Sequence, residues 1–201
     1  MKGLTICLWL AAGTALFGQT QSADRVIPAE PPTYVPMTQN KRLKRYLKDT
    51  VDPIAFLRSG ASAGFGQWRD RPKEWGEGSA AFGKRYASSF AEHITISSIM
   101  FGASSLLHED NRYLPSGKTG AAPRVRYALE SSFLARHNDG TRHVSISKLG
   151  AFAAAALISR RWQPHSSRGF GSAASNFSVT FSVAAGFDVM REFLPDLLHR
   201  K

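Results

Sequence analysis

Histidine and carboxylate side chains cluster in two short stretches of the sequence, and pairs of this kind can transfer protons in acid–base catalysis. One stretch holds Glu92 and His93, and the other holds His108, Glu109 and Asp110. On one continuous helix the two stretches lie about 22 Å apart, because each residue adds about 1.5 Å. They cannot share one metal ion or one substrate atom, so we predict no metal site and no bound cofactor.

The second stretch supplies the candidate catalytic residues, His108, Glu109 and Asp110. His108 could act with a carboxylate from another helix, such as Asp188 or Glu130, in a small exported hydrolase. The alternative is that the stretch forms the polar end of a helix and holds the following loop in place. We favour this structural interpretation.

Two strings imitate motifs of serine hydrolases. Residues 60–64 match G-x-S-x-G, and residues 145–148 match S-x-x-K. No strand precedes the first string, and the K-T-G string at 118–120 stands before the second string, which reverses the order that the enzymes use. We interpret both strings as structural.

The sequence is strongly basic. Its 201 residues hold 26 Lys and Arg against 15 Asp and Glu, a formal charge of +11 and a pI of about 10.2. An electrostatic partner should therefore be anionic. The length and an apolar content of 43% suit one globular domain. The single cysteine, Cys7, excludes a disulfide framework.

Residues 1–23 have the layout of a signal peptide. A lysine at position 2 is followed by an apolar run and then by polar residues, and cleavage after Gly18 or after Ala23 would fit. The apolar run is shorter than the roughly 20 residues that span a bilayer. The sequence thus predicts an exported protein, periplasmic or associated with the cell envelope.

A proline-rich linker over residues 24–39 precedes a short basic amphipathic helix over residues 40–51. The apolar residues of this helix, from Leu43 to Val51, are spaced as one face. The cations around that face are the predicted contacts with an anion: Lys41, Arg42, Lys44, Arg45 and Lys48. Such a helix can lie on an anionic membrane surface or bind an acidic glycan. The alternative is the solvated face of an ordinary surface helix.

The rest of the chain is predicted to be helical, within a single domain over residues 40–201. Asp52 suits a helix N-cap and Pro53 the first helical position. We expect further helices over residues 53–68, 78–107, 124–136, 145–161 and 171–193. Rows of Gly, Ala and Ser suit close packing, so we predict an all-α compact bundle of about five helices. The same rows could join copies of the chain in a homo-oligomer.

Residues 177–183 have a competing prediction. Phe and Val alternate there with Ser and Thr, which is the pattern of a half-buried strand. In an exported protein this pattern is also typical of a strand in a small outer-membrane β-barrel, which is therefore the alternative fold. Such a barrel needs at least about eight strands, and we find about three candidate segments, so the helical prediction is preferred.

Two polar side chains, Asn176 and Asp188, interrupt the apolar last helix. Each needs a partner there, because burying an unpaired polar group is costly. The candidate partners of Asp188 are Arg124, Arg126 and Arg136.

Two stretches resemble an uncharacterised family of exported bacterial helical proteins that carry an H-E-D-x-R-Y stretch. They are residues 106–113, Leu-Leu-His-Glu-Asp-Asn-Arg-Tyr, and residues 191–196, Arg-Glu-Phe-Leu-Pro-Asp. The resemblance covers most of the chain after Asp52, with departures at Asn111 and Leu114, where the family has a proline and an aromatic residue. It implies no activity, only that residues 108–113 belong to a shared feature.

These observations favour a non-enzymatic protein of the cell envelope that associates with an anionic surface, either lipid head groups or acidic glycans. The hydrolase around His108 and Glu109 is the enzymatic alternative. Nucleic acid is a weaker partner, because exported proteins rarely meet it and because only Tyr46 adds an aromatic ring to the basic segment.

Overall fold

The structure is a computed structural model that describes residues 34–198. The predicted signal peptide and the larger part of the predicted linker lie outside the described residues. Residues 34–38 contain no helix or strand, and the first helix begins at Gln39.

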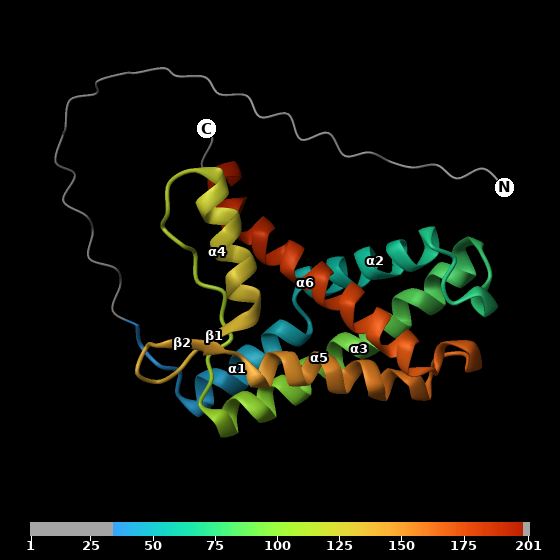
Figure 1. Cartoon of the computed structure of the whole chain (residues 1–201), viewed down its shortest axis with the longest axis horizontal. Coiled ribbons are helices and arrows are strands. Elements are labelled where there is room, and N and C mark those ends of the chain that lie inside the picture. Colours follow the sequence, from blue (N-terminus) through green and yellow to red (C-terminus); the bar gives the residue numbers. More distant parts are fainter. Residues whose placement is uncertain (1–33, 199–201) are drawn as a thin grey trace, which may run out of the picture. The chain divides into compact units, whose positions relative to one another are not determined.

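Six α-helices make up most of the described residues (Figure 1). They are α1 (Gln39–Thr50), α2 (Pro53–Trp68), α3 (Gly78–Leu107), α4 (Ala121–Phe133), α5 (Ile146–Ile158) and α6 (Phe170–Leu198). Single turns of 3₁₀-helix cover Lys73–Trp75, Ser159–Arg161 and His165–Ser167. Strands β1 (Leu134–Arg136) and β2 (Arg142–Val144) form the one small antiparallel sheet within residues 34–198. The predicted all-α class is confirmed.

Local sequence signals predicted several helix ends correctly. The carboxylate of Asp52 accepts a hydrogen bond from the Ile54 amide at 2.8 Å, and Pro53 is the first residue of α2. The bounds of α3 also agree with the predicted range of 78–107. Caps of this kind depend on residues close in sequence, which is why sequence reasoning finds them.

The end of α4 was predicted wrongly. The helix expected over residues 124–136 begins at Ala121 and ends at Phe133, because residues 134–136 pair with residues 142–144 instead. The hairpin turn contains Gly140 at a φ of 83°, a conformation that glycine adopts readily. Tertiary pairing therefore overrides the helical pattern of the last turn.

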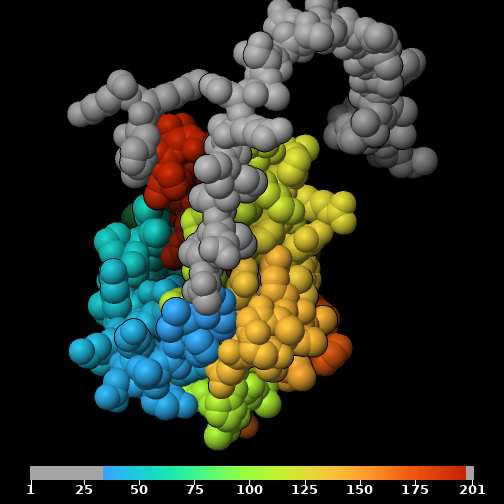
Figure 2. Space-filling model, turned by 90° about the vertical axis from the view of Figure 1, so that its left-hand side faces the viewer, coloured from blue at the N-terminus to red at the C-terminus, as the bar shows by residue number. Residues whose placement is uncertain are grey.

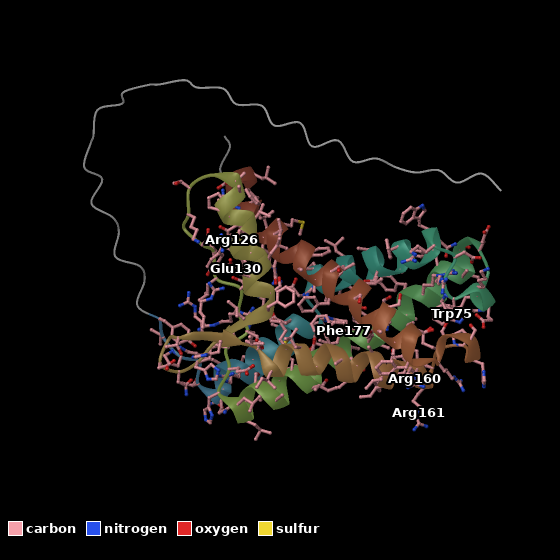
Figure 3. All side chains as sticks on the ribbon, viewed as in Figure 1. Trp75, Arg126, Glu130, Arg160, Arg161 and Phe177 are labelled. Carbon is pink, nitrogen blue, oxygen red and sulfur yellow. The ribbon has the colours of Figure 1, made fainter. Side chains whose placement is uncertain are left out.

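The strand alternative for residues 177–183 is wrong, because the segment lies within α6. As a helix it places Phe177 and Phe181 one turn apart, with stacked rings whose centroids lie 5.7 Å apart. Phe181 belongs to the central apolar cluster, and Phe177, labelled in Figure 3, packs against it. The predicted end at residue 193 is also wrong, since α6 continues through Pro195.

The helices pack through small residues. α3 contacts α1, α2 and α5, while α6 contacts α2, α4 and α5 (Figure 1). The central cluster consists of Ile96, Ala151, Phe152, Ala155 and Phe181. Most other buried apolar residues are alanines, which let helix backbones approach closely and agree with the predicted small-residue packing. Within residues 34–198 no helix has the length and apolar character needed to cross a membrane.

Candidate functional site

The polar segment that follows α3 joins the ends of several elements. His108 has a left-handed backbone with φ of 56° and ends α3, and its side chain is exposed. After this turn Glu109 reaches the N-terminus of α5. The next residue, Asp110, forms a backbone bridge with Arg136 of β1.

Glu109 is a buried carboxylate that caps α5. It is 1% exposed and accepts hydrogen bonds from the amides of Ile146 and Ser147, at 3.1 and 3.0 Å. The hydroxyls of Ser145 and Ser147 donate to it as well, at 2.9 and 2.5 Å. Both serines lie in the S-x-x-K string, which therefore begins a helix, as the structural interpretation predicts.

The hydrogen bonds decide the charge of Glu109. Burial by itself raises its pKa, but the bonds from Ser147, Ser145 and the α5 amides outweigh that effect and lower the pKa below its ordinary value. A carboxylate at a helix N-terminus also interacts favourably with the helix dipole. Glu109 is thus a fixed, ionised helix cap, which is poorly suited to transferring protons.

Asp110 ties the beginning of the described chain to the bundle. Its carboxylate accepts hydrogen bonds from the Arg112 guanidinium, with the shortest at 2.6 Å, and from the Tyr34 hydroxyl at 3.0 Å. Arg112 also donates to the carbonyl oxygen of Val35 at 3.1 Å. Burial raises the pKa of Asp110, and the bonds from Arg112 lower it by more. This contact matches the predicted role of a polar helix end that holds a loop.

The three catalytic candidates therefore do not form one acid–base site. Neither carboxylate considered as a partner for His108 bonds to it: Glu130 pairs with Arg126 at 2.7 Å, and Asp188 pairs with Arg191 at 3.7 Å. The arginines expected to pair with Asp188 do not appear among its ion pairs within the described residues, so that expectation was wrong.

Glu92 is a second buried carboxylate, in the middle of α3. The side-chain amide of Asn176 donates to both of its oxygens, each at 2.9 Å, which supplies the partner that Asn176 was predicted to need. Burial raises the pKa of Glu92 to about 7, and the bonds from Asn176 and Thr180 offset only part of that rise. Glu92 lines a cavity of about 150 Å³ whose wall mixes polar and apolar side chains.

Two of the five predicted contact cations on α1 already have partners within the protein. Arg42 is 5% exposed and donates to the carbonyl oxygens of Ser104 and Glu109, at 3.2 and 2.5 Å. It thereby satisfies carbonyls at the C-terminal end of α3, which a helix leaves unpaired. Arg45 pairs with Asp49 on the same helix at 3.0 Å.

The other side of α1 is exposed and mixes two kinds of residue. Three lysines, Lys41, Lys44 and Lys48, are exposed there. Three apolar residues are exposed too, Leu43, Leu47 and Val51, by 45, 58 and 63%. At about 100° per residue, the apolar residues form one stripe and the lysines form the stripe beside it. We call these six residues the outer face of α1 and include Val51, which directly follows the helix. The helix is blue in Figure 2 and lies on the surface in that view.

Tyr46 anchors the inner side of α1. Its ring stacks on Phe101 of α3, with centroids 5.0 Å apart, and its hydroxyl lies 2.9 Å from that of Ser98. The apolar face that the sequence predicted is therefore divided: Tyr46 packs inward, and the leucines remain exposed.

Two cations that were not among the predicted site residues, Arg58 and Lys148, line a central cavity of about 170 Å³. The signal that could have found them is that each is the single charged residue of its helix, α2 and α5 respectively. A lone cation in an apolar helix is unusual, because burying a charge without a partner is costly.

Comparisons with protein-family models, with curated proteins and with solved structures found no match to this chain. The resemblance carried by residues 106–113 and 191–196 stays a prediction. In the structure these two stretches meet, since the Tyr113 hydroxyl donates to Glu192 at 2.5 Å.

Within residues 34–198 no group of three or more His, Cys, Asp or Glu side chains is arranged to hold a metal ion.

Proposed function

We propose that this chain is a non-enzymatic protein of the cell envelope that binds the surface of an anionic membrane through the outer face of α1. The observation that carries the proposal is the exposed apolar stripe beside an exposed lysine stripe on one helix. Lysines of such a helix attract phosphate head groups, while leucines enter the boundary of the acyl chains. Export to the envelope rests on the signal-peptide pattern of residues 1–23.

Both stripes are needed for stable attachment. Each lysine close to an anionic bilayer contributes about 1 kcal/mol, so three contribute about 3 kcal/mol. A leucine side chain fully removed from water adds about 2 kcal/mol, and half-exposed leucines would add about half of that. The apolar stripe also favours lipid over an acidic glycan as the partner, because a glycan offers no apolar phase for the leucines.

The inner side of α1 presents the outer face in a fixed orientation. Arg42 bonds to the end of α3 and Tyr46 packs on Phe101, so the helix is already formed before it meets a membrane. Binding then avoids the entropy that a disordered segment loses when it folds on a surface.

The proposal is tested by sedimentation with vesicles of phosphatidylglycerol and phosphatidylcholine in equal parts, using the chain purified from the cells that make it. We expect binding to weaken between about 0.1 M and about 1 M salt, because the Debye length shortens from about 10 Å to about 3 Å. Replacing Lys41, Lys44 and Lys48 by glutamine should weaken binding by about 100-fold. Replacing Leu43 and Leu47 by serine should weaken it at both salt concentrations.

A matched control removes three exposed cations elsewhere: Lys73, Lys84 and Arg161. Arg161 is labelled in Figure 3 near the end of α5. This variant loses the same charge and should bind nearly as well as the natural chain. Equal losses in the two variants would mean that the net charge acts without a defined face, and an unchanged α1 variant would reject the proposal.

A further inference from the structure

A cavity of about 170 Å³ is lined by residues of α1, α2, α3, α5 and α6. Part of its wall belongs to the central apolar cluster and includes Ile96, Phe152 and Phe181. In another protein, an engineered apolar cavity of about 150 Å³ holds one benzene molecule. This cavity therefore has room for a small organic molecule.

The charged side chains that line the cavity are mostly cations. They are Arg42, Arg45, Arg58, Arg112, Lys148 and Arg191. The lining carboxylates, Asp49 and Asp188, are paired with Arg45 and Arg191. Arg112 bonds to Asp110 and to the carbonyl oxygen of Val35, and Arg42 bonds to backbone carbonyls. Among the described residues, Arg58 and Lys148 thus have no carboxylate partner.

Arg58 and Lys148 find few partners inside the protein. The Nε of Arg58 is buried and has no hydrogen-bond partner within residues 34–198. The ammonium of Lys148 donates to one carbonyl oxygen, that of Ser131, at 3.1 Å. Burial lowers the pKa of both side chains, and both are influenced by the charges of Asp188 and Arg191. The two cations line the same cavity as Asp188 and Arg191 of α6, and removal from water is costly for each of them.

We propose that the cavity binds a small organic anion, with its carboxylate or phosphate head between Arg58 and Lys148 and its apolar body against Phe152 and Phe181. A guanidinium and an ammonium form strong, charge-assisted hydrogen bonds with such a head. Neither cation forms an ion pair with a lining carboxylate, and burial outweighs the attraction of Asp188, so the anion adds negative charge where it is needed. The aromatic wall selects anions that carry an apolar group.

This site is independent of the outer face of α1. The α1 residues that line the cavity are Arg42, Arg45, Tyr46 and Asp49, and none of them belongs to the outer face of that helix. A variant of the cavity should therefore keep its binding to anionic vesicles, and the variant that lacks the α1 lysines should keep its binding of the small anion.

The experiment is isothermal titration calorimetry of the full chain with hexanoate, hexyl phosphate and hexanol, the last being a neutral molecule of similar shape. We expect saturable binding of one hexanoate or one hexyl phosphate per chain, at least tenfold tighter than hexanol. Arg58→Gln should weaken the binding of the anion at least tenfold. Arg126→Gln removes an exposed arginine of α4, labelled in Figure 3, and should bind like the natural chain.

Circular dichroism checks that each variant is folded. If Arg58→Gln does not fold, Lys148→Met tests the same head-group contact and should show the same loss. The proposal is overturned if neither anion binds, if hexanol binds as tightly as the anions, or if a folded variant of either cation keeps the natural affinity.

Discussion

Glu92 and Glu109 are both carboxylates with almost no exposed surface, 3% and 1%, yet their surroundings shift their pKa values in opposite directions. Burial raises the pKa of each. Glu109 meets two amides and two hydroxyls at the beginning of a helix, and these donors reverse the effect of burial. Glu92 meets mainly one side-chain amide, that of Asn176, and the effect of burial prevails. The balance between desolvation and the number of donors therefore decides the direction in which each pKa shifts.

The two carboxylates should consequently differ in what they contribute to stability. Glu109 connects the end of α3 to the start of α5 as an ion, so its loss leaves several donors unpaired. Glu92 crosses from α3 to α6 and is held at a pKa near neutrality, so its contribution depends on pH. Three substitutions test this difference between the two carboxylates.

The largest effect is expected from Glu109→Ala. It leaves two amides and two hydroxyls at the N-terminus of α5 without their acceptor, which should reduce the free energy of unfolding by about 4 kcal/mol. Urea unfolding followed by circular dichroism measures the loss. Glu130→Ala is the control, because that carboxylate lies on the surface of α4 and should change little. A loss as small as that of the control would show that Glu109 is not the cap we describe.

Glu92→Gln should alter the dependence of stability on pH. Between its ordinary pKa of 4.5 and about 7, the unfolded chain ionises Glu92 while the folded chain keeps it protonated. Stability must therefore fall as pH rises through this range, by about 3 kcal/mol for this group. The variant cannot ionise and lacks this fall.

The quantity to measure is the difference in unfolding free energy between Glu92→Gln and the natural chain, at a series of pH values. Taking the difference removes the contributions of the other acids, which both proteins share. The unfolding free energy of the variant should rise relative to that of the natural chain from about pH 4.5 to about pH 7, and the difference should then stay constant. Parallel curves would show that Glu92 titrates normally and would remove the contrast with Glu109.

The smallest effect is expected from Tyr113→Phe. The hydroxyl donates to Glu192, another buried carboxylate, but Ser116 and Arg124 bond to the same group. Loss of one donor among several should reduce the free energy of unfolding by about 1 kcal/mol. Urea unfolding measures it beside Glu109→Ala. A loss as large as that of Glu109→Ala would mean that single donors matter more than their number.

Part of the candidate site could be predicted from the sequence. The stretch from His108 to Tyr113 was found because polar residues at a helix end are recognisable, and its structural interpretation agrees with the contacts of Glu109 and Asp110. The hydrogen-bond donors to Glu109 could not be assigned from the sequence, because Ser145 and Ser147 lie more than thirty residues from Glu109 along the chain.

The basic helix, too, could be predicted only in part from the sequence. Its position and its cations were predicted from their spacing, whereas the separation of Arg42 from the three exposed lysines depends on where the end of α3 lies. Lone cations such as Arg58 were missed, because their surroundings consist of side chains from other helices.

Short-range patterns in the sequence were enough to predict the all-α class, the cap at Asp52 and the bounds of α3, since each depends on neighbours within a few residues. Tertiary structure alone decided the opposite pKa shifts of Glu92 and Glu109, the exposed outer face of α1 and the cations of the central cavity. Those properties arise from desolvation and hydrogen bonding between helices that are far apart in the chain, and a linear pattern does not encode such distances.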